Sequence, residues 1–252
     1  MKRINKKLLI FFGVILFLGF YLYIAHFLIY YRLGHSTVRY LDRQALYEIG
    51  DTQGDVASLV YVALGDSFSS GQGAKSYEES FPYLLAVDLA KDKKTKVILQ
   101  NFSVPGVRSA QVVSGQLEQA ISAKADIITL LIGTNDVHGG IDKEVFRKNY
   151  IKILDELVQK TSAKIYIIGL PDTGRDGLLW PPYNYYFKYQ TTEYNKIIKG
   201  LASDYDLTYI DLENSLQSKV QDEDAYYSSD SFHPSAEGYQ LWAQIIYDSF
   251  YR

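Results

Sequence analysis

The chain has 252 residues, a formal net charge of −3 and no cysteine. With 47% hydrophobic and 22% charged residues, its composition is that of a chain with a packed core and excludes a largely disordered protein. The lack of cysteine excludes a disulfide framework, a thiolate zinc site and a cysteine nucleophile. Four basic residues and no acidic ones lie before residue 32, so the remainder of the chain is acidic. It therefore lacks the excess of positive charge that is typical of proteins that bind nucleic acid.

Residues 8–31 form one apolar segment that contains no Asp, Glu, Lys or Arg. About 20 apolar residues suffice for a helix to cross the hydrocarbon core, so this segment is predicted to be a transmembrane helix. Its far end is rich in tyrosine, as membrane interfaces often are. The basic residues of segment 1–7 predict a cytoplasmic N-terminus, a single pass through the cell membrane and an extracellular remainder. Four basic residues precede the helix: Lys2, Arg3, Lys6 and Lys7.

A cleaved signal peptide is the alternative interpretation of this segment. Such peptides have a shorter apolar region and a cleavage site of small residues, whereas bulky residues follow Ala25 here. An uncleaved anchor is therefore favoured. Residues 32–57 are polar and mixed in charge, which predicts a stalk with a short helix over 37–47, and residues 58–252 form the predicted soluble domain.

The soluble domain alternates between apolar runs typical of buried strands and segments of helical periodicity. This alternation predicts an α/β fold with a parallel sheet covered by helices on both faces. Ligands of such sheets bind outside the carboxyl ends of the strands, near a switch in strand order. Strands are expected at 59–64, 97–102, 127–132, 164–170 and 207–212, and helices at 77–91, 109–123, 142–161, 185–205 and 235–251.

Polar residues follow several of these strands, and together they supply what acyl transfer by serine requires. Ser67 lies between a buried strand and two glycines, where a tight turn would expose its hydroxyl. Asp230 lies three residues before His233, close enough to orient an imidazole that acts as a base. Gly106 and Asn135 can each present an N–H to an oxyanion. Taken singly, each motif is usually a turn or a helix cap, and only their order along the predicted sheet edge favours chemistry.

The sequence resembles the SGNH hydrolases, also called the GDSL esterase/lipase family. The resemblance covers roughly residues 59–250 and rests on four blocks in the family's order: 63–71 (ALGDSFSSG), 101–106, 133–136 (GTND) and 230–234 (DSFHP). It implies a flavodoxin-like three-layer α/β/α sandwich on a five-stranded parallel sheet. Phe68 replaces the leucine of the name-giving motif, at a position that varies within the family.

The resemblance also implies roles for individual residues. Ser67 would be the nucleophile, and its own N–H would form the oxyanion hole with Gly106 and Asn135. His233 would act as general base and then general acid, and Asp230 would orient it. Among the other histidines, His26 falls in the apolar segment and His35 in the stalk, while His138 either lines the pocket or lies exposed in a loop. Asp66 and Asp136 are interpreted as turn or hydrogen-bonding residues.

The loop 171–188 follows the fourth predicted strand and is expected to overhang the site. Trp180 and Tyr183, with neighbouring aromatic residues, would form a wall for an acyl chain or a sugar ring, or would pack the loop onto the domain. Arg175 would pair with an anionic substrate or with a neighbouring aspartate. Both interpretations stay open for each residue.

The sequence thus predicts a membrane-anchored extracellular carboxylic ester hydrolase that acts on a small-molecule, lipid or glycan ester. No metal site or cofactor is expected, because the histidines are scattered and no phosphate-binding glycine loop occurs. An acyltransferase acting on a cell-surface glycan is one alternative, disfavoured by the lack of a multi-span acyl-donor domain. An inactive membrane-tethered binding module is the other, disfavoured because no catalytic residue is missing.

Overall fold

A computed structural model describes residues 6–34, 46–50, 58–176 and 178–251. Its centre is a six-stranded sheet with the order β1-β3-β2-β4-β5-β6. The strands β2 to β6 are mutually parallel, as predicted. The six strands are β1 Tyr47–Ile49, β2 Leu59–Gly65, β3 Val97–Asn101, β4 Ile127–Leu131, β5 Lys164–Ile168 and β6 Thr208–Ile210.

The sixth strand corrects the prediction of a five-stranded sheet behind a stalk. Residues Tyr47–Ile49 of the predicted stalk form β1, which pairs antiparallel with β3 and opposes Tyr47 to Leu99. Tyr47 and Ile49 are buried while Glu48 is exposed, and the Tyr47 ring stacks on Tyr77 with 4.8 Å between centroids. An edge strand buried on one face needs only this alternation, and three residues are too few for it to stand out in sequence. The predicted helix over 37–47 otherwise falls outside the described residues.

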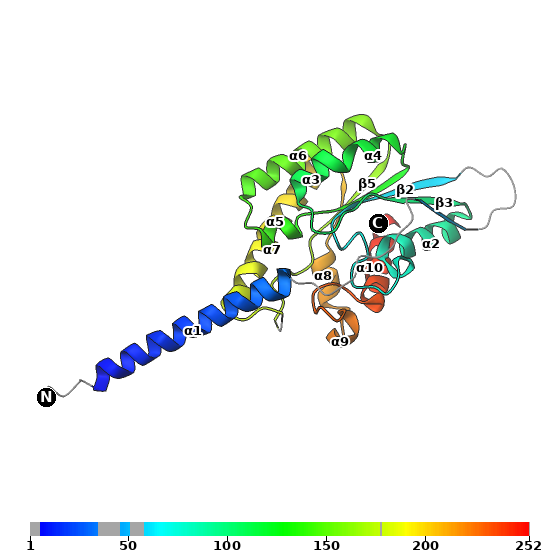
Figure 1. The fold of residues 1–252 in the computed structure, drawn as a ribbon. Helices are drawn as coiled ribbons and strands as arrows, with labels where there is room; N and C mark the ends of the chain where they lie inside the picture. Colours follow the sequence, from blue (N-terminus) through cyan, green and yellow to red (C-terminus); the bar gives the residue numbers. More distant parts are fainter. Residues whose placement is uncertain (1–5, 35–45, 51–57, 177, 252) are drawn as a thin grey trace.

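Helices cover both faces of the sheet (Figure 1). The helices α2 and α10 pack together on one face, and α3, α4, α6 and α7 cover the other. The covering helices are α2 Phe81–Lys93, α3 Ser109–Gly115, α4 Leu117–Ser122, α6 Lys143–Lys160, α7 Tyr183–Asp204 and α10 Ala236–Asp248. Shorter turns complete the domain: η1 Tyr77–Glu79, α5 Thr134–His138, α8 Leu212–Gln217, α9 Glu223–Tyr226 and η2 Ser249–Tyr251.

A local interaction determines where one predicted helix begins, and a tertiary contact accompanies a break in another. The side chain of Asp142 caps α6 by accepting hydrogen bonds from the N–H groups of Glu144 and Val145, as predicted from sequence. The predicted helix over 109–123 is instead two helices, α3 and α4, that meet at Gln116. The buried Gln116 side chain accepts from the N–H of Gly65 at 3.0 Å and donates to its carbonyl at 2.8 Å. This contact ties the break between the helices to the end of β2.

The order of the parallel strands places a switch point at the centre of the sheet. From β2 the chain runs to β3 on one side and then returns to β4 on the other. The loops that leave the carboxyl ends of β2 and β4 therefore diverge, and a crevice forms between them in folds of this kind. Ser67 comes two residues after the end of β2.

The helix α1 (Lys6–Gly34) extends away from the domain (Figure 1). By length and composition it is apolar enough to cross a membrane over Lys6–Ile29. Its first part is exposed, whereas Ala25 is fully buried and Ile29 packs against the domain core. One end of α1 is thus attached to the domain, and the other projects freely.

Candidate active site

Ser67 lies on a turn whose conformation depends on Gly65 at the end of β2. Gly65 has a φ of +146°, and a side chain there would collide with the carbonyl oxygen of Leu131 on β4. The Ser67 carbonyl accepts hydrogen bonds from the N–H of Gln72 at 3.0 Å and from the Ser70 hydroxyl at 2.9 Å. The turn is therefore closed on itself, and it holds the Ser67 hydroxyl at the sheet edge.

His233 and Asp230 complete a hydrogen-bonded chain with Ser67. The Nε2 atom of His233 lies 2.9 Å from Ser67 Oγ, and its Nδ1 atom lies 2.6 Å from Asp230 Oδ2. The exposed fraction is only 7% for Ser67 and 4% for His233, so bulk water has little access to the hydrogen bond between them. The structure thus brings together three residues that are up to 166 positions apart in sequence.

Asp230 is held in its charged form. Burial raises the pKa of this carboxyl, but its interactions with His233 and the backbone N–H groups outweigh burial and bring the pKa well below its usual range. Its Oδ1 atom accepts from the N–H groups of Phe232 and His233 at 2.9 and 2.8 Å, and from the Ser228 hydroxyl at 2.8 Å. A carboxylate fixed at both oxygens orients the imidazole and stays available to stabilise an imidazolium.

The loop that carries Ser67 and the loop that carries His233 approach each other at Gly73. A side chain at position 73, where φ is +104°, would collide with the Pro234 carbonyl and come within 2.7 Å of His233 Cβ. Only glycine permits this approach, so Gly73 helps to set the distance between Ser67 and His233. Gly73 is the second of the two glycines that follow Ser67 in the sequence, and its contact with the His233 loop was not predicted.

Arg175 contacts the segment 227–233, which carries Asp230 and His233. Its Nη1 atom donates to the Ser231 carbonyl at 2.9 Å, its Nη2 atom pairs with Glu223 at 3.0 Å, and its guanidinium lies 3.8 Å from the Tyr227 ring centroid. The acidic partner of Arg175 is Glu223 rather than a neighbouring aspartate, and pairing with an anionic substrate stays a prediction.

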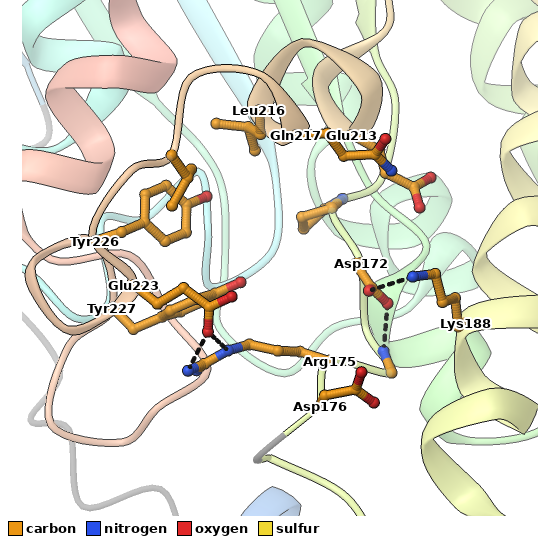
Figure 2. A pocket seen from close by; sticks show the side chains of 13 residues that line it. Asp172, Arg175, Asp176, Lys188, Glu213, Leu216, Gln217, Glu223, Tyr226 and Tyr227 are labelled. Atoms are coloured by element: carbon orange, nitrogen blue, oxygen red, sulfur yellow. Dashed lines mark hydrogen bonds and ion pairs between the residues drawn. The ribbon is translucent and has the colours of Figure 1, made fainter.

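Arg175 also borders a pocket of about 440 Å³ that Tyr226 and Tyr227 line, next to the segment 228–233 (Figure 2). Lys188 pairs with Asp172 across it at 3.9 Å, and Asp172 accepts from the N–H of Gly174 at 2.8 Å. The other charged side chains that line it are acidic: Asp176, Glu213 and Glu223. The ion pairs of Arg175 with Glu223 and of Lys188 with Asp172 thus join the segments that line this pocket.

Of the two predicted oxyanion donors other than Ser67, Gly106 lies on the loop after β3 and Asn135 lies in α5. Gly106 has a φ of +79°, with open space where a side chain would be. Asn135, in the first turn of α5, donates through Nδ2 to the Val107 carbonyl at 3.0 Å and approaches Asp66 Oδ2 at 3.4 Å. Asn135 therefore bridges the Gly106 loop and the turn that carries Ser67.

Asp66 and Asp136 belong to a buried polar network behind these donors. Ser109 donates to both oxygens of Asp136, from its hydroxyl at 2.6 Å and its N–H at 2.9 Å. Asp66 accepts from the N–H of Phe68 at 3.2 Å. Burial raises the pKa of Asp66 to about 7, and the charge of Asp136 adds to this effect. Both aspartates thus position backbone and amide groups around the site.

His138 lies within aromatic rings next to His233. Its ring centroid is 5.3 Å from those of Phe187 and Phe232, and the Phe232 ring is 4.9 Å from His233. Burial lowers the pKa of His138 to about 4, against a hydrogen bond with the Thr173 backbone, so the ring is neutral near pH 7. Within the described part of the chain, its buried Nε2 atom has no hydrogen-bond partner.

Trp180 and Tyr183 contact α1. The Trp180 ring stacks on Tyr21 at 6.0 Å between centroids, and the Tyr183 ring lies 6.0 Å from His26. The two predicted alternatives for these residues were a substrate wall and packing on the domain, and contact with the N-terminal helix was not among them. Whether they also touch substrate stays a prediction.

Residues 63–241 match the profile of the GDSL-like lipase/acylhydrolase family. The chain belongs to this family. It is 26% identical over 211 residues to the spore germination lipase LipC of Bacillus licheniformis, a match that covers 75% of this chain and 95% of LipC. A multidomain esterase of Ruminococcus flavefaciens is 31% identical over 121 residues, which span 46% of this chain and 14% of that esterase.

Solved structures agree on the fold. The lipase Lip_vut3 from a goat rumen metagenome superposes with a TM-score of 0.64 at 22% identity, covering 77% of this chain and 98% of the lipase. The prediction of the GDSL family and of its α/β fold is therefore confirmed, and the chain is a carboxylic ester hydrolase.

Proposed function

We propose that the chain is a membrane-anchored serine ester hydrolase that works outside the cytoplasm through Ser67, His233 and Asp230. The observation that carries the proposal is the continuous hydrogen-bonded chain from Ser67 Oγ through the His233 ring to Asp230, at 2.9 and 2.6 Å. A serine hydroxyl is a weak nucleophile unless an oriented base takes its proton, and this chain supplies both base and orientation.

The geometry supports the following acylation step. As Ser67 Oγ bonds to the ester carbonyl carbon, its proton moves to His233 Nε2, and Asp230 stabilises the resulting imidazolium. The carbonyl oxygen becomes an oxyanion that accepts hydrogen bonds from the N–H groups of Ser67 and Gly106 and from the Asn135 amide. The carbon–oxygen bond to the alcohol then breaks, and His233 returns its proton to the leaving alcohol.

Deacylation repeats the same chemistry with water. His233 takes a proton from a water molecule as the water oxygen attacks the acyl-serine carbonyl. The N–H groups of Ser67 and Gly106 and the Asn135 amide donate hydrogen bonds to the second oxyanion. Collapse of this intermediate releases the carboxylic acid and returns the proton to Ser67 Oγ. Because Ser67 and His233 are buried, competing proton exchange with bulk solvent is limited.

The location follows from α1 and the residues before it. The helix is apolar enough to span a membrane over Lys6–Ile29, and basic residues at its start favour a cytoplasmic N-terminus. The catalytic domain then lies on the outer side, as a single-pass protein of the cell membrane. Its substrate would be a small-molecule, lipid or glycan ester.

The direct test uses a fluorophosphonate probe and a short-chain p-nitrophenyl ester. The wild-type chain should be labelled by the probe and should hydrolyse the ester, and Ser67→Ala should lose both properties. Ser122→Ala, at an exposed position on α4, is the matched control and should retain both. Full activity in Ser67→Ala would show that another nucleophile acts.

The same experiment separates the alternatives. An inactive binding module would not be labelled. An acyltransferase would be labelled, but it would transfer the acyl group to an added sugar acceptor in preference to water. Product analysis with and without the acceptor distinguishes transfer from hydrolysis.

A further inference from the structure

Exposed aromatic side chains gather where α7 begins. We call Trp180, Tyr185, Tyr186 and Tyr189 the aromatic tip; their exposed fractions are 41%, 66%, 49% and 58%. They lie on the loop before α7 and on its first two turns. Large aromatic groups exposed together on a folded domain mark a surface that contacts a partner or a membrane.

The aromatic tip lies beside α1 (Figure 1). Trp180 stacks on Tyr21, and Tyr183 contacts His26. Tyr21, Ala25 and Ile29 follow one another at intervals of four residues, so they share one face of the helix. Ala25 is fully buried and Ile29 packs on the domain core, so this face docks on the domain. The position of α1 in a membrane therefore also sets the position of the aromatic tip.

The part of α1 that projects freely is too short to cross a bilayer. Residues 8–20 precede the first contact with the domain, and at 1.5 Å per residue they span about 20 Å. The hydrocarbon core is about 30 Å thick. The level of Tyr21 and Trp180 therefore does not rise above the outer boundary of the hydrocarbon core, and the side chains around them reach the interface at that boundary.

The chemistry of the aromatic tip suits this depth. Trp and Tyr prefer the membrane interface because their rings are apolar and their N–H or O–H groups bind water and headgroups. Lys188 lies between the tip tyrosines on α7, and its side chain is 56% exposed and paired with Asp172 at 3.9 Å. Lys143 lies over the Tyr189 ring at 5.2 Å and marks the polar edge of the surface.

We propose that the aromatic tip is a membrane-seating surface, inserted into the interface of the outer leaflet next to α1. The inference rests on the proposed anchor. Seating also orients the active site, since ring contacts lead from Tyr186 to Phe187, then to His138, Phe232 and His233. The catalytic edge of the sheet is thereby held at the bilayer surface.

Tryptophan fluorescence tests the seating directly, because the chain has only two tryptophans and Trp242 is fully buried. The full chain is reconstituted into phosphatidylcholine vesicles whose acyl chains carry bromine either near the ester end or near the methyl end. Bromine near the ester end should quench the wild-type emission severalfold more than that of Trp180→Phe, and more than bromine near the methyl end. Equal quenching of both proteins would overturn the proposal, because Trp180 would then stand clear of the lipid.

Spin labels give an independent measurement, because the chain has no cysteine to interfere. A label at Tyr185→Cys should be relaxed more by membrane-soluble oxygen than by an aqueous nickel complex. The matched control is Lys160→Cys at the far end of α6, where the order should reverse. The opposite result at position 185, with the nickel complex dominant, would place the aromatic tip in water and overturn the proposal.

Failure of seating and failure of the proposed function are distinguishable. A chain that floats with the vesicles and reacts with the fluorophosphonate probe, but shows no quenching of Trp180, refutes seating alone. A chain that does not float with the vesicles refutes both the anchor and the seating. Lack of probe labelling in a chain with quenched Trp180 refutes the hydrolase mechanism and supports seating.

Discussion

The raised pKa of Asp66, in the turn that carries Ser67, can be tested through the pH dependence of stability. Burial and the nearby charge of Asp136 raise its pKa from 3.8 to about 7, although the Phe68 N–H opposes them. The unfolded chain ionises this carboxyl at its ordinary pKa. Between about pH 4 and pH 7 the folded chain therefore holds a proton that the unfolded chain has lost. The stability contributed by the protonated group is fully present below pH 4 and is lost as the pH rises through 7.

The size of this loss follows from the two pKa values. Each pKa unit corresponds to about 1.4 kcal/mol, so the change from 3.8 to about 7 amounts to about 4 kcal/mol at full ionisation. Asp66→Asn removes the titration and keeps an oxygen for the Phe68 N–H. Its amide faces the Asn135 amide, which adds a penalty that does not depend on pH.

The assay is urea unfolding of the full chain in detergent micelles, for wild type and Asp66→Asn, at several pH values. The free energy of unfolding of Asp66→Asn, minus that of the wild type, should rise by up to about 4 kcal/mol from pH 4 to pH 7 and then level off. Contributions from carboxyls common to both proteins largely cancel. A difference that stays constant across this range would refute the reasoning, because it would mean that Asp66 titrates alike in both states.

Substitutions at three further positions test the site. Asp230→Asn should lower kcat for a p-nitrophenyl ester by about 10⁴, because the amide favours the wrong imidazole tautomer; a loss below tenfold would contradict its role. Asn135→Ala should lower kcat by about 10²–10³ with KM nearly unchanged, since its amide acts on the transition state; an effect confined to KM would argue for substrate binding instead. Arg175→Ala leaves the Ser231 carbonyl without its donor and should lower the free energy of unfolding by about 1–3 kcal/mol in urea titrations. Arg175→Lys should restore part of that loss, and equal stability in all three proteins would remove Arg175 from the support of the triad segment.

Local sequence signals predicted much of the fold because they act over a few residues. The continuous apolar runs at β2 and β4 require burial on both faces, and the Asp142 cap needs only the first turn of α6. The edge strand β1 was missed because three residues carry too little periodicity to distinguish a strand from a linker. The break at Gln116 was missed because its cause is Gly65, 51 residues away.

For the active site, residue types and their order were sufficient to bring Ser67, Asn135, Asp230 and His233 into consideration. Parallel strands release their chains at one edge, so the alternation of strands and helices already implied that these residues meet. The sequence could not indicate the supports, because each depends on a contact between distant segments. Gly73 against His233 and Arg175 against Ser231 are two such contacts.

The sequence by itself determined the family, the parallel α/β sheet and the one long apolar helix, because composition, periodicity and motif order are properties of the chain alone. Only the tertiary structure decided the distances between Ser67, His233 and Asp230, the raised pKa of Asp66, and the contact of Trp180 with Tyr21. These features depend on packing and on the exclusion of water between segments that are far apart along the chain. For Trp180 the difference matters most: the sequence suggested that it forms part of a substrate wall, and in the structure it stacks on Tyr21 of the apolar helix α1.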